Sequence, residues 1–145
     1  MIVPAPYSVA LTGALEAELR ARYGDDDATH AEPAQFLPPY GLFLVARVDG
    51  QEVACGGWRT LEPGVGEVKR MYVVPAFRGR GLARHVLRGL VADATTQDMK
   101  RLVLETGPLQ PEAIALYTAE GFAACEAYGE WEPGSSLFFA RDLLS

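Results

Sequence analysis

Residues 67–84 read EVKRMYVVPAFRGRGLAR, and this stretch decides the fold. Residues 67–74 are rich in β-branched and aromatic side chains, which favours a strand. Pro75 ends that strand because proline has no N–H to donate to a neighbouring strand. From Leu82 onward the apolar residues recur at helical spacing, so we predict a helix over residues 79–96. The stretch therefore predicts a strand, a turn and a helix start in direct succession.

Two glycines, Gly79 and Gly81, stand where the predicted helix begins. Without Cβ atoms they let a ligand approach the backbone closely. The amides of the first helical turn have no partner inside the helix and lie at the positive end of its dipole. Such a helix start binds phosphate groups. We therefore expect this turn to hold a phosphorylated ligand.

A dinucleotide-binding turn also joins a strand to a helix through glycines, so the two patterns must be separated. The pattern G-x-G-x-x-G would begin at Gly79, keep Gly81 and require a glycine at position 84. Arg84 occupies that position, and residues 97–100 form a polar turn where the pattern expects a second strand with an acidic residue. A nucleotide-binding oxidoreductase is therefore disfavoured.

The stretch resembles the acyl-CoA signature of the GNAT superfamily of N-acetyltransferases, Arg/Gln-x-x-Gly-x-Gly/Ala, which Arg78, Gly81 and Ala83 match. The run 67–75 before it is also typical of that family. A second match lies at residues 104–122, where the aromatic Tyr117 precedes a Gly-Phe pair. The matches cover roughly residues 66–122, and the first 40 residues fit the family only in general plan.

The order of the predicted elements agrees with the fold that this resemblance implies. We expect an α/β (α+β) fold in three layers, with a mixed, mostly antiparallel central sheet of about six to seven strands and helices on both faces. Its centre would be a parallel pair of strands, and Gly56-Gly57 would mark a bulge or a close backbone approach. The expected helices are 8–23, 79–96 and 111–120, and the expected strands are 42–48, 51–61, 67–74, 101–105, 122–128 and 137–141, with a short helix or loop near Phe36.

Composition narrows the function classes further. A chain of 145 residues with 49% hydrophobic and 22% charged residues is expected to form one globular domain, 1–145. Its formal net charge of −6 argues against nucleic acid as a partner and leaves a cationic substrate open. We expect no membrane partner and a cytoplasmic location, because no apolar run is long enough to span a bilayer and no signal peptide is recognisable.

Neither the cysteines nor the histidines have the spacing of metal ligands. Cys55 and Cys125 stand far apart in strand-like sequence, so we expect two buried, reduced thiols. His30 and His85 are also far apart. We therefore expect no metal site.

The resemblance implies acetyl-CoA (coenzyme A) as cosubstrate. Its diphosphate would lie on the backbone amides from Arg78 to Ala83, and its pantetheine arm would pair with the end of the central strand. Arg84 and Arg88 could also touch it, although both fit a solvated helix face. The residues expected at the cofactor are Met71, Tyr72, Val73, Arg78, Gly79, Arg80, Gly81, Leu82, Ala83, Arg84 and Ala113.

Acetyl transfer to an amine also needs a base and a proton donor. Glu67 is the leading base by resemblance, because it stands eleven positions before Arg78 as the glutamate of histone-acetylating members does. The alternative is an ordinary strand acid paired with Lys69, Arg70 or Arg59. Glu105 is the second candidate, and other family members use water chains. Tyr117 would give a proton to the leaving thiolate; its alternative is a core tyrosine.

The acceptor is the least defined part of this hypothesis. The resemblance places it near the first two helices and the loop between the last two strands, where acidic and aromatic residues suit a cationic primary amine, on a small molecule or on a protein or peptide. A non-catalytic acyl-CoA-binding regulatory or sensor module of the same fold is the alternative function. The resemblance also implies a homodimer. The expected acceptor residues are Asp25, Asp26, Asp27, Glu32, Phe36, Trp131 and Glu132, with Tyr40 and Trp58 nearby.

Overall fold

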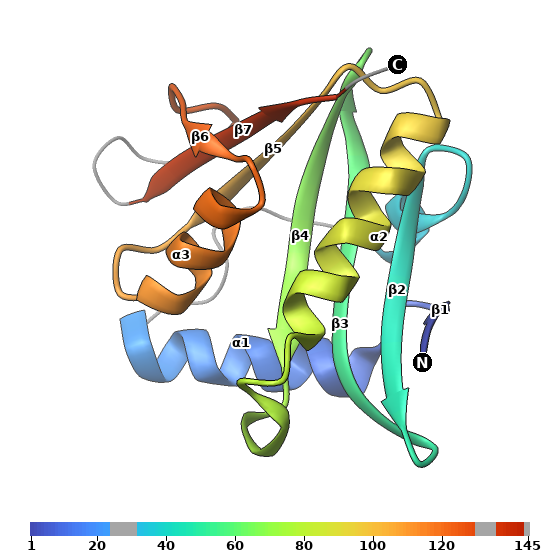
Figure 1. Ribbon diagram of the computed structural model, residues 1–145, viewed down its shortest axis with the longest axis vertical. Coiled ribbons are helices and arrows are strands. Elements are labelled where there is room, and N and C mark those ends of the chain that lie inside the picture. The colour runs from blue at the N-terminus through green and yellow to red at the C-terminus, as the bar shows by residue number, and fades with distance from the viewer. Residues whose placement is uncertain (24–31, 130–135, 144–145) are drawn as a thin grey trace.

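The computed structural model describes residues 1–23, 32–129 and 136–143. Its seven-stranded sheet has the order β1-β2-β3-β4-β5-β7-β6, and only the pair β4–β5 is parallel. This mixed sheet with helices on both faces confirms the predicted fold class (Figure 1). The elements are β1 (Ile2–Pro4), α1 (Val9–Tyr23), η1 (Pro33–Phe36), β2 (Gly41–Val48), β3 (Gln51–Glu62), β4 (Val65–Val73), η2 (Pro75–Phe77), α2 (Leu82–Thr96), β5 (Arg101–Thr106), α3 (Pro111–Ala119), β6 (Ala123–Ala124) and β7 (Leu137–Asp142).

Two apolar clusters, one on each face of the sheet, make up the core. On one face α2 buries Val86, Leu87 and Leu90 against the sheet, and α3 packs beside it. On the other face α1 packs Leu11 and Leu15 together with η1. No helix in the described ranges is long and apolar enough to cross a membrane.

The hairpin between β2 and β3 turns where the sequence predicts it, with positive φ at Asp49 and Gly50. Two other expected boundaries are wrong. The helix α2 begins at Leu82, not at residue 79, because Gly79 and Gly81 both have left-handed backbones that a helix excludes. The strand expected over 122–128 pairs only at Ala123–Ala124.

A β-bulge interrupts β4 where it pairs with β3. The register passes from Cys55↔Tyr72 to Gly57↔Lys69, so Gly56 faces both Arg70 and Met71. The irregularity therefore lies at the predicted glycines, but β3 continues through both of them and the extra residue belongs to β4. A Cβ at Gly56 would collide with the Met71 sulfur and crowd Val86, so these side chains would have to shift to admit it.

The parallel strands β4 and β5 separate soon after they meet. They pair only where Val65–Glu67 lies beside Arg101–Val103. Beyond that point the two strands diverge, with α3 on one side and α1 on the other (Figure 1). In the part of the chain that the structure describes, the second half of β4 therefore has no strand partner on its β5 side.

Candidate functional site

The open edge of β4 presents backbone groups toward the gap between β4 and β5. The amide of Val74 donates to the Val53 carbonyl at 2.8 Å, toward β3. Backbone groups of a strand alternate in direction, so those of Val73 and Met71 point away from β3. The Val73 carbonyl accepts a hydrogen bond from Arg78 Nε at 2.9 Å. A linear amide-bearing ligand could pair with this edge.

The turn before α2 lies beside the end of this edge. Gly79 and Gly81 have φ of +81° and +78°, and nothing lies within 4 Å of where a Cβ of Gly79 would be. Within the described ranges, no amide from Gly79 to Arg84 donates to another backbone carbonyl. The first hydrogen bond of the helix runs from the His85 amide to the Gly81 carbonyl at 3.1 Å. The turn therefore offers several amide donors at the positive end of α2.

The arginines expected at the cofactor have different surroundings. Arg78 pairs with Glu18 of α1 at 2.8 Å and lies over the Tyr72 ring, with 5.6 Å between guanidinium carbon and ring centre. Arg80 stacks on Phe77 at 4.8 Å and stays at the turn. Arg84 turns instead toward Glu120 at the end of α3, at 3.3 Å.

Tyr117 points from α3 into the core and is 7% exposed. Its ring meets Phe122 edge-on at 5.9 Å between centres, whereas the structure shows no hydrogen-bond partner for its hydroxyl among the described residues. Burial, and to a lesser extent the charge of Glu105, raises the pKa of Tyr117 well above its ordinary value. A buried hydroxyl without a partner is costly, which makes it a candidate for contact with a ligand. Ala113, expected at the cofactor, packs from the same helix against the core.

Glu67 is almost fully buried, with 1% exposed, and is held by two other side chains. Arg59 Nη2 and Nε donate to its Oε1 at 2.8 and 3.0 Å. The hydroxyl of Tyr128 donates to its Oε2 at 2.7 Å. Gln35 of η1 accepts from Arg59 Nη1 at 2.8 Å and extends the network. Glu67 is thus the strand acid paired with Arg59 that the sequence left as the alternative to a base.

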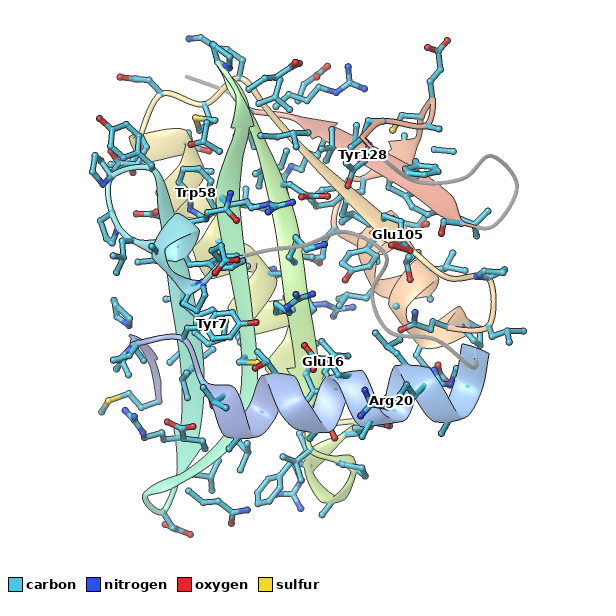
Figure 2. All side chains as sticks on the ribbon, turned by 180° about the vertical axis from the view of Figure 1, so that it is seen from behind. Tyr7, Glu16, Arg20, Trp58, Glu105 and Tyr128 are labelled. Carbon is cyan, nitrogen blue, oxygen red and sulfur yellow. The ribbon has the colours of Figure 1, made fainter. Side chains whose placement is uncertain are left out.

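Tyr128 is a site residue that sequence reasoning missed. It lies within the stretch expected as a strand, and no motif singles it out. Burial, followed by the charge and hydrogen bond of Glu67, raises the pKa of Tyr128 strongly, so the phenol stays protonated. Glu105, at the end of β5, is half-buried, and its charge acts on both tyrosines. Figure 2 shows Tyr128 and Glu105 on the same side of the sheet, with α1 below them.

The expected acceptor residues divide into three groups, one of which consists of Glu32 and Tyr40, both exposed to solvent. Asp25, Asp26, Asp27, Trp131 and Glu132 lie outside the described residues. Phe36 is buried and packs with Tyr7 and Phe43, so it belongs to the core under α1. Trp58 is also a core residue, whose indole donates to Asp93 at 2.9 Å. Neither aromatic ring is exposed to a ligand.

The cysteine prediction is only half right. Cys55 is buried, and burial raises the pKa of its thiol to about 12. Cys125 is partly exposed, because it follows the short β6 and only its amide, bonded to the Phe138 carbonyl at 2.9 Å, continues the sheet. Both thiols are free.

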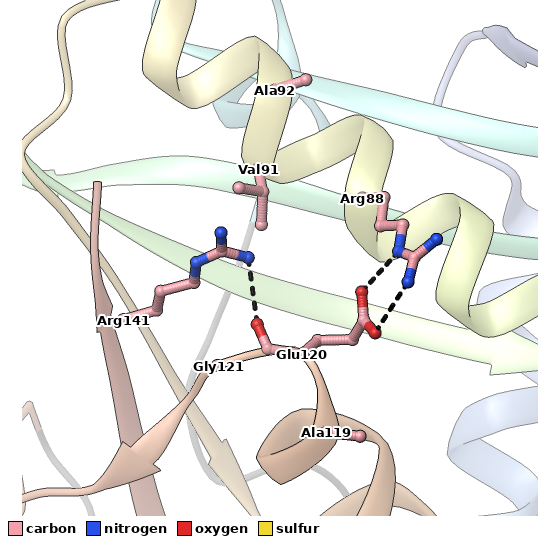
Figure 3. Close-up of a pocket in the computed structure, with 7 residues that line it drawn as sticks. All are labelled: Arg88, Val91, Ala92, Ala119, Glu120, Gly121 and Arg141. Carbon is pink, nitrogen blue, oxygen red and sulfur yellow. Dashed lines mark hydrogen bonds and ion pairs between the residues drawn. The ribbon is translucent and has the colours of Figure 1, made fainter. Parts of the chain in front are cut away.

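A separate open pocket of about 570 Å³ lies between α2, the end of α3 and β7 (Figure 3). Its charged groups meet at Glu120, whose carboxylate binds Arg88 at 2.6 Å and whose carbonyl accepts from Arg141 at 3.0 Å. These contacts connect three elements, so we interpret the polar lining as structural. Its remaining lining residues are Val91, Ala92, Ala119 and Gly121.

Comparison with known proteins decides the family. The model of the acetyltransferase (GNAT) family matches residues 10–122. The chain belongs to this family. It is therefore an acyltransferase, as the sequence motifs predict. The match extends far upstream of residues 66–122, into the segment that α1 and η1 occupy.

Individual relatives agree with the family assignment. An IAA acetyltransferase of Azospirillum brasilense is 42% identical over 103 residues, which cover 70% of this chain and 67% of that protein. A solved structure described as an acyl-CoA N-acyltransferase from Klebsiella pneumoniae has 34% identity and a TM-score of 0.81, and the match covers 99% of this chain and 97% of that one. A GNAT acetyltransferase from Elizabethkingia anophelis with acetyl-CoA bound shares the fold, with 20% identity, a TM-score of 0.70 and coverage of 99% of each chain.

Proposed function

We propose that this GNAT acetyltransferase transfers an acetyl group directly from acetyl-CoA to the nitrogen of a primary amine. The observation that carries this proposal is the separation of β4 from β5 directly beside the glycine turn. An edge of backbone donors and acceptors runs from this gap to the amides of residues 79–84, which donate to no backbone carbonyl of the described residues. Pantetheine amides and a diphosphate are the two ligand chemistries that these features match.

The residues present fit acetyl-CoA. The amides of residues 79–84 would hold the diphosphate, with Arg80 as a cation beside them, and the bare Cα of Gly79 allows close approach. Arg78 would have to exchange its contact with Glu18, or share it, to reach a phosphate. The backbone of Met71–Val73 would pair with the pantetheine arm. When bound, acetyl-CoA supplies a thioester whose carbonyl carbon the amine attacks.

Tyr117 would act on the leaving sulfur. As the C–N bond forms, the C–S bond breaks, and the thiolate takes a proton. Burial keeps Tyr117 protonated at neutral pH, so its hydroxyl can donate a hydrogen bond to the sulfur as negative charge develops there. If the phenol passes its proton to the thiolate, solvent returns a proton to the phenolate before the next turnover. The amine, in turn, must lose a proton before or during attack.

Of the two candidate bases, Glu105 is the better placed to accept that proton. Glu67 already accepts three hydrogen bonds, two from Arg59 and one from Tyr128, so both of its carboxylate oxygens are occupied. Glu105 lies at the divergence of β4 and β5, close enough to act on Tyr117. We propose Glu105 as the base and Glu67 as the anchor of Tyr128.

The proposal is tested by following thiol release from acetyl-CoA with a panel of primary amines, together with calorimetric binding of CoA. Binding and amine-dependent release are expected. Binding without release for every amine would support the sensor module of the same fold, and the absence of CoA binding would refute both functions. Size-exclusion chromatography with light scattering would test the predicted homodimer, and fractionation of cells would test the cytoplasmic location.

A further inference from the structure

The bulge in β4 places two cationic side chains on the same face of the sheet. In a regular strand Lys69 and Arg70 would point to opposite faces. Here Arg70 and Met71 share one partner, Gly56, so the alternation is broken after Lys69. The guanidinium of Arg70 reaches the α1 face, where its Nε donates to the Tyr7 hydroxyl at 2.9 Å. Lys69 is on that face too, since its pairing partner Gly57 abuts Phe36 and Phe43.

The backbone of Arg70 is unusual for a residue with a side chain. Its φ is +63°, a region that glycine normally fills, and among the described non-glycine residues only Asp49 and Asp98 share a positive φ. Such a conformation inside a strand persists only when the surroundings impose it, and it is frequent at functional sites. The same residue immediately precedes Met71, whose backbone lies on the open edge of β4.

The α1 face is rich in buried cations. Arg59, Lys69 and Arg70 are 7%, 7% and 9% exposed. Glu67 neutralises Arg59 through their ion pair. Lys69 and Arg70 each make further contacts within the protein, so a ligand anion would join or exchange with those contacts. Figure 2 shows two further acids on this side of the sheet, Glu16 of α1 and Glu105 of β5.

We propose that the acceptor is an amino acid, whose carboxylate binds to Arg70 and Lys69 while its amine faces Glu105. This inference rests on the proposed acetyl transfer and names the substrate class of that site. A simple cationic amine would be repelled by two buried cations, whereas a zwitterion satisfies both signs of charge. The two cations would also lower the pKa of the acceptor ammonium and so raise the fraction of neutral, reactive amine.

The test compares amino acids with their decarboxylated counterparts: L-phenylalanine with phenethylamine, L-tryptophan with tryptamine, and L-leucine with isoamylamine. Thiol release from acetyl-CoA gives kcat and KM for each, and calorimetry measures amino-acid binding to the CoA-loaded protein. We expect kcat/KM to be about 10- to 100-fold higher for at least one amino acid than for its counterpart.

Variants at Arg70 then assign the preference to this residue. Arg70→Gln should raise KM for the amino acid about 10- to 100-fold and leave the counterpart nearly unchanged. Arg70→Gly removes the side chain and suits the positive φ, so it stays informative if Arg70→Gln folds poorly. Arg70→Lys should restore part of the affinity. The matched control is Arg47→Gln, which alters an exposed cation at the β2–β3 hairpin.

Several results would overturn the inference. One is equal kcat/KM for both members of every pair in the wild type. Another is a loss in Arg70→Gly that affects both members equally, which would indicate a purely structural role. Acetyl-CoA binding and turnover of simple amines without any amino-acid preference would refute the carboxylate subsite alone. Absence of CoA binding would refute the proposed function as well.

Discussion

Tyr117 has the clearest chemical assignment among the single residues, because its buried hydroxyl has no protein partner among the described residues. Tyr117→Phe removes only that oxygen and keeps the ring contact with Phe122. If the hydroxyl serves the leaving sulfur, kcat should fall about 10²-fold, with a smaller change in the affinity for CoA. Thr96→Val, which removes an exposed hydroxyl at the end of α2, is the control. A Tyr117→Phe enzyme with wild-type kcat would make Tyr117 a core residue only.

Changing Glu105 to glutamine should affect catalysis, whereas changing Glu67 to glutamine should affect stability. Glu105→Gln should abolish the rise of kcat/KM with pH that the ionisation of a base produces, while the folded state is retained. Its pH–rate profile in the presence of saturating acetyl-CoA measures this. A profile that keeps its rising limb would exclude Glu105 as the base.

Glu67→Gln should act mainly on stability. It leaves the Arg59 guanidinium buried without its counter-charge, which is expected to lower the free energy of unfolding by about 3–5 kcal/mol. Urea denaturation measures this loss. A stable Glu67→Gln variant whose rising limb is gone would restore Glu67 as the base and contradict the anchoring role.

At the scale of elements, the glycine turn before α2 contributes both to the stability of the fold and to the proposed binding of acetyl-CoA. Gly81→Ala forces a Cβ into the left-handed region and should destabilise the protein by about 1–2 kcal/mol, while it weakens acetyl-CoA binding. Gly13→Ala is the matched control, because Gly13 lies inside α1 with open space around it and should become more stable by about 0.5–1 kcal/mol. Thermal unfolding with and without acetyl-CoA measures both effects.

The end of α3 is fixed by Glu120. The hydrogen bond from Arg88, followed by the charges of Arg88, Arg84 and Arg141, lowers the pKa of Glu120, although burial opposes this. A lowered pKa means that the interaction stabilises the fold fully above the unfolded pKa of about 4.3 and is lost as pH falls through the folded pKa. Glu120→Gln should therefore melt lower than the wild type at pH 7, and the difference should shrink between pH 5 and 3. A difference in melting temperature that is constant with pH would contradict this.

At the scale of the whole molecule, the gap between β4 and β5 is a weak point that the cosubstrate would close. Acetyl-CoA at about 100 times its Kd should stabilise the native state by about 2.7 kcal/mol and raise Tm by about 5–10 °C. Hydrogen exchange should slow at Met71–Val73 and Gly79–Arg84, the two segments proposed to bind it. NAD at equal concentration is the control. If acetyl-CoA slowed hydrogen exchange evenly over the whole sheet, binding at these two segments would be contradicted.

The local sequence determined the order of the central elements and the motif that identifies the family. The β-branched run before Pro75, the paired glycines and the apolar spacing after Leu82 specify strand, turn and helix, because each depends on backbone preferences within a few residues. The parallel pair β4–β5 follows from the helix that separates its strands. The acyltransferase motif lies wholly inside this local pattern, so the family was readable from it.

Only the tertiary structure decided which charged side chains pair with one another. Glu67 finds Arg59 across the β3–β4 ladder and Tyr128 61 positions along the chain. The bulge turns Arg70 onto the α1 face, and Arg84 turns from the cofactor turn to Glu120. Such partners depend on register and on long-range packing, and a register change of one residue moves a side chain to the opposite face. For this reason the sequence predicts the glycine turn, Glu67, Glu105 and Tyr117, whereas Tyr128 and the placement of Arg70 become visible only in the fold.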